Sequence, residues 1–196
     1  LTFDDGPHPT ITFKVLDELR ARNIKATFFV LGDRVKQYPW ILQQIAAEGH
    51  EIGNHTYSHR LLTAMTNEAI DREITETQNL IKQTIDYEPS LFRPPYGAFR
   101  PGTKEIFQEH NLSVILWSVD PRDWKARDRD KIYNSVTNHV RSGSIVLCHD
   151  IHLATLHALP HILDTLLAEG YQFTTVSQLC GLPSQQPPKL AGAPSR

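Results

Sequence analysis

Short apolar runs rich in β-branched and aromatic residues alternate along this chain with longer amphipathic segments. Seven runs have the composition of strands: L-T-F, K-A-T-F-F-V-L, H-E-I-G-N-H, L-F-R-P, S-V-I-L-W-S-V, S-I-V-L-C-H and Q-F-T-T-V. Between them we predict helices at about residues 11–22, 39–47, 67–85, 101–110, 129–141 and 153–168. This alternation is typical of β/α units built around a parallel sheet, so we predict an α/β fold.

The helix predicted over residues 67–85 has clear boundaries and one apolar face. Isoleucines recur on that face at spacings of four and seven: Ile70, Ile74, Ile81 and Ile85. Thr66 is the expected N-cap. Gly49 and Gly170 each follow the end of a predicted helix, where a residue with positive φ is needed.

The length of the chain, 196 residues, suits one domain with a core and a cleft. We predict that this domain covers residues 1–181 and that residues 182–196, rich in Pro, Gln and Ser, form a flexible tail. The first strand is only three residues long and lacks a preceding methionine, so we expect a chain cut from a longer protein. Cys148 and Cys180 are expected to be free thiols.

Charge and hydropathy exclude two classes of partner. The 20 basic and 22 acidic side chains nearly cancel, and the basic ones are scattered, so no nucleic-acid partner is expected. The longest apolar runs, around A-T-F-F-V-L and S-I-V-L-C, are far shorter than the ~20 residues of a membrane-spanning helix. We therefore predict no transmembrane segment in this chain and a substrate with little charge.

Polar side chains gather where the predicted strands end: Asp4 and Asp5 after the first, His55 and His59 after the third, Arg93 after the fourth, the segment from Asp120 to Trp124 after the fifth, and His149 with Asp150 at the end of the sixth. Successive β/α units close into a barrel or open into a doubly wound sheet, and in both the loops after the strands meet at one edge. These residues should therefore face one mouth. The D-D-G-P turn has no G-x-G-x-x-G pattern, so a dinucleotide-binding fold is not indicated.

The sequence H-T-Y-S-H places His55 and His59 four residues apart, on one side of a helical turn, where both imidazoles can hold one metal ion. Two ligands do not make a site, and a carboxylate is the natural third. Thr56 replaces the glutamate of the H-E-x-x-H pattern, so a general base must come from elsewhere. One of the adjacent Asp4 and Asp5 can complete the ligand set, while the other takes a proton from water. The alternatives are an acidic turn and a pair of surface histidines.

Five short motifs follow one another between residues 2 and 149: T-F-D-D-G-P, H-T-Y-S-H, R-P-P-Y-G, D-P-R-D-W and L-C-H. In this order they resemble the motifs of the polysaccharide deacetylases, the family 4 carbohydrate esterases that share the NodB homology domain. The resemblance implies a distorted, TIM-barrel-like (β/α) barrel of about seven to eight strands with its active site at the strand carboxyl ends. It also implies a metal-dependent hydrolase that removes N-acetyl groups from N-acetylglucosamine residues of a cell-wall polysaccharide. Peptidoglycan is the expected substrate, and chitin or chitooligosaccharide is the alternative.

The resemblance also implies roles at the centre of the site. Asp5, His55 and His59 resemble the metal ligands of the family. Asp4 resembles the catalytic base, and His149 resembles the catalytic acid. A ligand set of two histidines and one aspartate suits zinc best, and cobalt or nickel fit the same ligands.

Supporting roles follow in the same way. Arg93 resembles the residue that pairs with the base, and Asp123 the residue that orients the acid. The backbone N–H of Tyr96 resembles the oxyanion donor. Leu147 resembles the wall of the acetyl pocket, with plain barrel filling as the alternative, and Trp124 resembles a side wall of the sugar groove, with a core aromatic as the alternative.

Two other classes of protein compete with this reading. A glycosidase would use two carboxylates set ~5 to 9.5 Å apart and would leave the two histidines without a task. A non-catalytic sugar-binding relative would typically have lost a ligand or the base. We expect an N-acetylated glycan as the partner and the cell envelope or the extracellular space as the location. Asp150 is assigned to solvent or turn structure, and the other histidines, His8 and His152 among them, receive no role.

Overall fold

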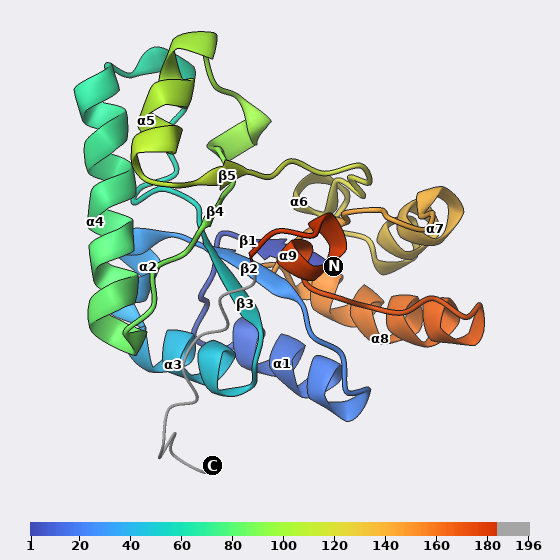
Figure 1. Ribbon diagram of the computed structural model, residues 1–196. Coiled ribbons are helices and arrows are strands. Elements are labelled where there is room, and N and C mark those ends of the chain that lie inside the picture. The colour runs from blue at the N-terminus through green and yellow to red at the C-terminus, as the bar shows by residue number, and fades with distance from the viewer. Residues whose placement is uncertain (184–196) are drawn as a thin grey trace.

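The structure, a computed structural model, describes residues 1–183 (Figure 1). Its six strands form one parallel sheet in the order β5-β4-β3-β2-β1-β6. The strands are β1 (Thr2–Asp4), β2 (Thr27–Val30), β3 (Glu51–Asn54), β4 (Leu91–Phe92), β5 (Ser113–Val114) and β6 (Leu147–His149). Of the predicted tail, residues 184–196 lie outside the described part of the chain.

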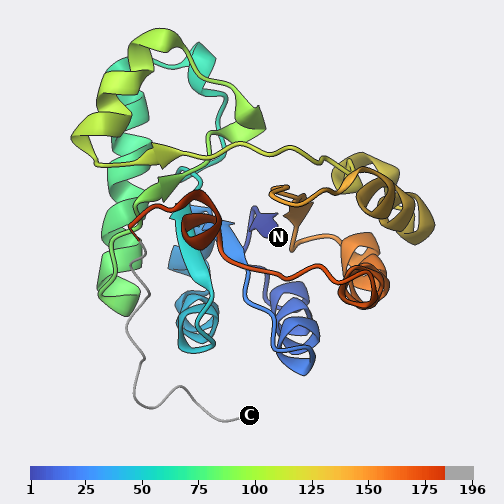
Figure 2. The same cartoon turned by 45° about the vertical axis from the view of Figure 1, so that its right-hand side comes forward.

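Helices connect the strands and pack around them (Figures 1 and 2). The α-helices are α1 (Ile11–Ala21), α2 (Gly32–Gln37), α3 (Pro39–Ala47), α4 (Asn67–Ile85), α5 (Lys104–Glu109), α6 (Asp123–Ala126), α7 (Arg129–His139), α8 (Leu153–Ala168) and α9 (Val176–Cys180). Short 3₁₀ turns lie at η1 (Leu62–Ala64), η2 (Pro95–Gly97) and η3 (Pro101–Thr103).

All six predicted helices are confirmed within two residues, with the one expected at 101–110 divided between η3 and α5. Thr66 caps α4 as predicted, because its hydroxyl accepts a hydrogen bond from the Ala69 N–H at 3.3 Å. Gly49 and Gly170 have φ of 74° and 86°, as residues that end helices with a reversed backbone should.

The sheet is closed into a distorted barrel by the segment that follows β5. Ile115 N–H donates to the Phe92 carbonyl on the β4 side, at 2.8 Å. A few residues later, Val119 pairs with Val146, and Leu147 N–H donates to the Val119 carbonyl at 2.9 Å. One extended segment therefore touches both edges of the sheet. The predicted fold class is confirmed.

Successive side chains of each strand point alternately to the outer face of the sheet, which packs against helices, and to the inside of the barrel. On the outer face of the sheet, the rings of Phe3 and Phe28 stack at 5.1 Å in the main core, beneath α1, α3 and α8. On the inner face, Thr2 donates to the Val146 carbonyl, and Asp4 is 2% exposed. Residues two apart in a strand share a face, so Asp4 reaches the inside of the barrel because Phe3 fills the core outside it.

The expectation of a seventh strand at Q-F-T-T-V is wrong. Thr175 instead caps α9 in a capping box with Gln178. The first N–H groups of α9 donate to side chains inside the barrel: Val176 N–H to Thr27 Oγ1 at 3.0 Å and Ser177 N–H to Glu51 Oε2 at 3.2 Å. The segment has no vacant sheet edge to join, since residues 115–119 already bridge the two edges. Both views place α9 against the strands (Figures 1 and 2).

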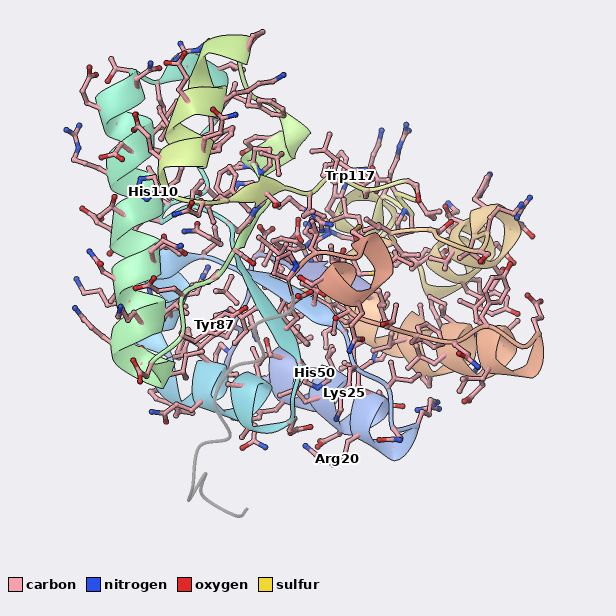
Figure 3. The ribbon with its side chains drawn as sticks, viewed as in Figure 1. Arg20, Lys25, His50, Tyr87, His110 and Trp117 are labelled. Carbon is pink, nitrogen blue, oxygen red and sulfur yellow. The ribbon has the colours of Figure 1, made fainter. Side chains whose placement is uncertain are left out.

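The two ends of the barrel differ in character. Lys25 and His50 precede β2 and β3 and lie together at one end (Figure 3). Trp117 follows β5 and lies toward the opposite end, where the strands terminate (Figure 3). Polar residues that follow the strands therefore meet at the Trp117 end.

Two further sequence expectations concern the chain as a whole. No helix within residues 1–183 combines the length and the apolar character needed to cross a bilayer. Cys148 is buried, Cys180 is exposed, and both are free thiols, as predicted.

Close packing inside the barrel leaves no room for a side chain at Gly53. A Cβ at this position would lie 2.5 Å from the Phe29 ring and 3.2 Å from the Leu91 carbonyl. We predict that Gly53→Ala lowers the free energy of unfolding by about 1 to 3 kcal/mol in urea denaturation, because a displaced aromatic side chain must be repacked. Gly102→Ala is the matched control, since nothing lies within 4 Å of a Cβ there. Equal unfolding midpoints for the two variants would contradict the prediction.

Candidate metal centre and active site

The turn after β1 sends two neighbouring carboxylates in different directions. Asp4 is the last residue of the strand and faces the barrel interior, where its Oδ1 accepts a hydrogen bond from Arg93 at 2.7 Å. Asp5 has φ of 73°, so the chain reverses there. Its Oδ1 consequently approaches two imidazoles, at 3.4 Å from His55 Nε2 and 3.3 Å from His59 Nε2. The repulsion expected for adjacent acids is thus relieved by separate partners.

Asp5, His55 and His59 together form a group with the composition and spacing of a metal site. One ligand atom from each lies within 4.8 Å of the others. His55 directly follows β3, and His59 is reached through a turn in which Thr56 and His59 both have positive φ. Among residues 1–183, the buried Oδ1 of Asp5 has no hydrogen-bond partner. Such an oxygen beside two imidazoles fits a divalent cation.

The protonation of these three side chains also suits a cation. His55 Nδ1 lies 2.6 Å from the Arg93 carbonyl and must donate to it, which leaves the lone pair of Nε2 facing the group. Burial lowers the pKa of His59, which favours the neutral imidazole. Burial raises the pKa of Asp5, but the nearby histidines outweigh it and bring the pKa down to about 2. Asp5 is therefore a carboxylate at neutral pH, and both imidazoles direct Nε2 toward it.

Arg93 lies at the centre of the barrel, where its side chain is fully buried. Its guanidinium donates to Thr2 Oγ1 at 2.8 Å and to Asp4 Oδ1 at 2.7 Å. Two backbone carbonyls of the closing segment, those of Ile115 and Leu116, accept from it at 3.2 and 3.1 Å. Burial lowers the pKa of Arg93, but an arginine with an adjacent carboxylate remains a cation at neutral pH.

Asp4 therefore has one oxygen occupied and one available. Its Oδ2 lies 3.7 Å from His55 Nε2, on the side of the three-residue group. The ring of Phe29 supports the guanidinium of Arg93 from below, at 4.1 Å. This arrangement fixes the Asp4 carboxylate at the edge of the group formed by Asp5, His55 and His59.

A second buried pair lies at the end of β6, the strand that pairs directly with β1. His149 Nδ1 lies 2.7 Å from Asp123 Oδ1, and the His149 backbone N–H donates to Asp123 Oδ2 at 2.8 Å. Thr155 Oγ1 also donates to Asp123 Oδ2, at 2.6 Å. Burial lowers the pKa of His149, but Asp123, with Asp4 and Asp5, outweighs it and raises the pKa to about 9. The imidazole is therefore protonated at neutral pH and points its Nε2–H away from Asp123.

Three further predicted residues surround these groups. Tyr96 is 65% exposed, has φ of 61°, and places its ring 4.8 Å from that of His59. Trp124 is half exposed, and its backbone N–H donates to Asp123 Oδ1 at 3.0 Å. Leu147 is buried on β6, two residues before His149 and on the same face of the strand. All ten predicted site residues thus lie at one end of the barrel or on the strands that lead to it.

Comparison with known proteins agrees with this geometry. The family model described as polysaccharide deacetylase matches residues 1–115. The chain is 43% identical over 179 residues to the peptidoglycan-N-acetylmuramic acid deacetylase PdaC of Bacillus subtilis. Superposition on the solved structure of PdaC gives a TM-score of 0.88. The superposed part covers 92% of this chain and 88% of the PdaC chain.

The chain belongs to the polysaccharide deacetylase family.

Two other members show the range of the family. The peptidoglycan-N-acetylglucosamine deacetylase PgdA of Listeria monocytogenes is 41% identical over 92% of this chain. A chitooligosaccharide deacetylase of Rhizobium leguminosarum bv. trifolii is 38% identical over 91% of it. The chain spans 38% of the length of PdaC and of PgdA, and 89% of the length of the rhizobial protein.

The expectation that Asp150 belongs to solvent or turn structure is right about the turn and wrong about solvent. Its side chain is 1% exposed, and its Oδ2 accepts from Thr12 Oγ1 at 2.5 Å. A Cβ on Gly6 would collide with this carboxylate, so Asp150 supports the turn that carries Asp5. The position directly after His149, at the end of a buried strand, was the available signal.

Two other residues of this polar framework were missed. Thr155 holds Asp123, and Thr2 accepts from Arg93 while it donates to the Val146 carbonyl at 2.8 Å. Threonine is common in strands and in the first turn of helices, so neither residue carries a sequence signal of its own.

The Asp123–His149 pair gives a prediction for the metal-free protein. We expect His149 to titrate near pH 9 by NMR and its pKa to fall toward the ordinary 6.5 in Asp123→Asn, because the amide no longer stabilises the imidazolium. Asp120→Asn, three residues away, should leave the pKa of His149 near 9. An unchanged pKa in Asp123→Asn would show that the pair does not control the charge.

Asp150 gives a prediction for stability. Burial raises its pKa from 3.8 to about 7, so the folded protein holds this proton over a pH range in which the unfolded chain has lost it. The free energy of unfolding should therefore fall by about 2 to 3 kcal/mol between pH 5 and pH 8 relative to Asp150→Asn, which cannot titrate. Urea unfolding of both proteins at the two pH values measures this difference. Parallel behaviour of the two proteins would refute it.

Proposed function

We propose that this protein is a metal-dependent N-deacetylase that acts on N-acetylglucosamine residues of peptidoglycan. One observation carries the proposal. Two titratable groups, Asp4 and His149, lie beside each other at the paired ends of β1 and β6 and close to the three-residue group, and each is held by its own buried partner, Arg93 or Asp123. Amide hydrolysis needs such a pair, because a base must activate water and an acid must protonate the departing amine.

Asp5, His55 and His59 would hold the metal ion. We propose zinc, which imidazole-rich sets favour, with cobalt or nickel as alternatives for the same ligands. A divalent cation bound there supplies a water of lowered pKa and a positive charge that polarises the amide carbonyl.

Asp4 serves as the general base in this proposal. Its Oδ2 faces the ligand group, and its Oδ1 is occupied by Arg93, so one oxygen is directed at the attacking water. The guanidinium fixes the carboxylate and balances its charge within the barrel. Asp4 then accepts the proton that the water loses as it attacks the amide carbon.

His149 serves as the general acid. Asp123 holds Nδ1–H and keeps the imidazole protonated, so Nε2–H is available at neutral pH. It donates a proton to the amide nitrogen as the C–N bond breaks, since a neutral amine leaves and an amide anion does not. The products are acetate and a free amino sugar.

The remaining predicted residues receive substrate-binding roles. We assign the backbone N–H of Tyr96, in a loop beside His59, to the developing oxyanion. Leu147, on the inner face of β6 below His149, would contact the acetyl methyl group. The half-exposed indole of Trp124 would lie against a sugar ring.

Peptidoglycan is the proposed glycan because PdaC and PgdA, both named as peptidoglycan deacetylases, cover more than nine tenths of this chain at over 40% identity. Chitooligosaccharide is the second candidate, since the rhizobial relative is named for it and aligns over most of both chains. Action on the cell wall would place the protein in the cell envelope or outside the cell.

Acetate release tests the proposal. Peptidoglycan fragments and chitooligosaccharides should both release acetate, chelation should abolish the release, and added zinc should restore it. Asp4→Asn should reduce kcat at least 100-fold, because general base catalysis contributes about that much. Asp164→Asn, an exposed carboxylate on α8, is the control and should retain full activity.

Asp4→Asn also leaves Arg93 without its charge partner, so loss of activity needs a second variant. His149→Gln preserves the Asp4–Arg93 pair and should be equally inactive while it still binds zinc. Activity that survives the chelator, or that is unchanged in either variant, would disprove the mechanism.

A further inference from the structure

A cavity of about 520 Å³ opens beside the proposed acid and takes no part in the mechanism above. Three parts of the chain surround it: the start of α1, the end of α6, and residues 151–154 at the start of α8. His152 lies in its wall, with its ring 5.8 Å from that of His149. The cavity therefore adjoins the residue that we propose as the acid.

The polar side of the cavity carries positive charge. Arg127 follows α6 in a left-handed conformation, with φ of 44°, and lines the cavity with an exposed side chain. Within residues 1–183 its guanidinium has neither a hydrogen bond nor a carboxylate partner. Burial has the largest effect on the lowered pKa of His152; Asp123 and Asp5 oppose the lowering, His149 adds to it, and the charge of Arg127 makes the smallest contribution. No acidic residue lines the cavity.

His8 adds a hydrogen-bond donor to the same wall. Its Nδ1 accepts the N–H groups of Thr10 and Ile11, both at 3.2 Å, so the proton of the neutral ring resides on Nε2. Burial and the charge of Arg34 lower the pKa of His8, which favours this neutral form. The cavity thus offers a free guanidinium and imidazole N–H groups, and no side-chain carboxylate competes for them.

The rest of the wall is apolar. Ile11, Ile151, Leu153 and Ala154 line the cavity, and Leu153 is 57% exposed although it is a leucine. Apolar surface beside an unpaired cation suits a ligand that has both a small aliphatic part and an acidic end. A plain N-acetylated sugar, which has no charge, would leave Arg127 without a partner.

We propose that this cavity is a subsite for a carboxylate-bearing aliphatic arm of the glycan. The lactyl group of muramic acid, with one methyl group and one carboxylate, has this chemistry, as do the carboxylates of a short peptide attached to it. This inference rests on the proposed function and narrows its substrate class to acidic glycans. Arg127 and His8 bind the carboxylate, and Leu153 and Ile11 contact the aliphatic part.

Three glycans of equal length distinguish the possibilities: an uncharged chitooligosaccharide, an alternating glycan with free lactyl carboxylates, and the same glycan with peptides attached to the lactyl groups. Arg127→Gln should raise KM about tenfold for an acidic glycan and leave KM for the chitooligosaccharide unchanged, because only the acidic arm reaches the guanidinium. Lys125→Gln, an exposed cation of α6 that does not line the cavity, is the matched control and should change neither value.

The two acidic glycans identify the source of the carboxylate. Dependence on Arg127 with the free lactyl glycan assigns the lactyl carboxylate, and dependence only with the peptide-bearing glycan assigns the peptide. An equal change in KM for charged and uncharged glycans, or no change for either acidic glycan, would overturn the proposal. Calorimetric binding of the same glycans to His149→Gln, with and without Arg127→Gln, gives the comparison without turnover, so a protein that releases no acetate still tests the subsite.

Discussion

The buried pair of Arg93 and Asp4 is the interaction on which the rest of the site depends. An arginine inside a barrel must find acceptors for its donors, and here they come from β1 and from the closing segment after β5. The backbone carbonyl of the same residue fixes the His55 ring through Nδ1. One residue thus orients the proposed base with its side chain and a proposed ligand with its main chain.

In the second buried pair, the carboxylate of Asp123 holds the imidazole of His149, whereas in the first pair the guanidinium of Arg93 holds the carboxylate of Asp4. A carboxylate without solvent accepts from an imidazole, a backbone N–H and a threonine hydroxyl, so its charge is satisfied at several points. Asp4 and His149 belong to neighbouring strands, β1 and β6, and are register partners there. The parallel pairing of two strands therefore sets the separation of the base and the acid.

Much of this arrangement was predictable from the sequence, because the signals are local. Apolar periodicity located the helices, and the polar residues after each strand pointed to one mouth, with the motif resemblance assigning their roles. The failures concern long-range competition. Q-F-T-T-V has the composition of a strand, but residues 115–119 already join the two edges of the sheet. The Q-F-T-T-V segment therefore leads into α9 instead of forming a strand. Asp150 reads as a turn residue, and only the tertiary contact with Thr12 and Gly6 shows that it is buried.

The segment that closes the barrel has a consequence for its dynamics. Residues 115–119 lend carbonyls to the guanidinium and also join the two sheet edges through a few backbone hydrogen bonds. A fluctuation that breaks these backbone hydrogen bonds would also remove two hydrogen-bond acceptors from the guanidinium of Arg93. Opening of the barrel at this segment and disorder of the proposed catalytic carboxylate are therefore coupled, because both involve residues 115–119.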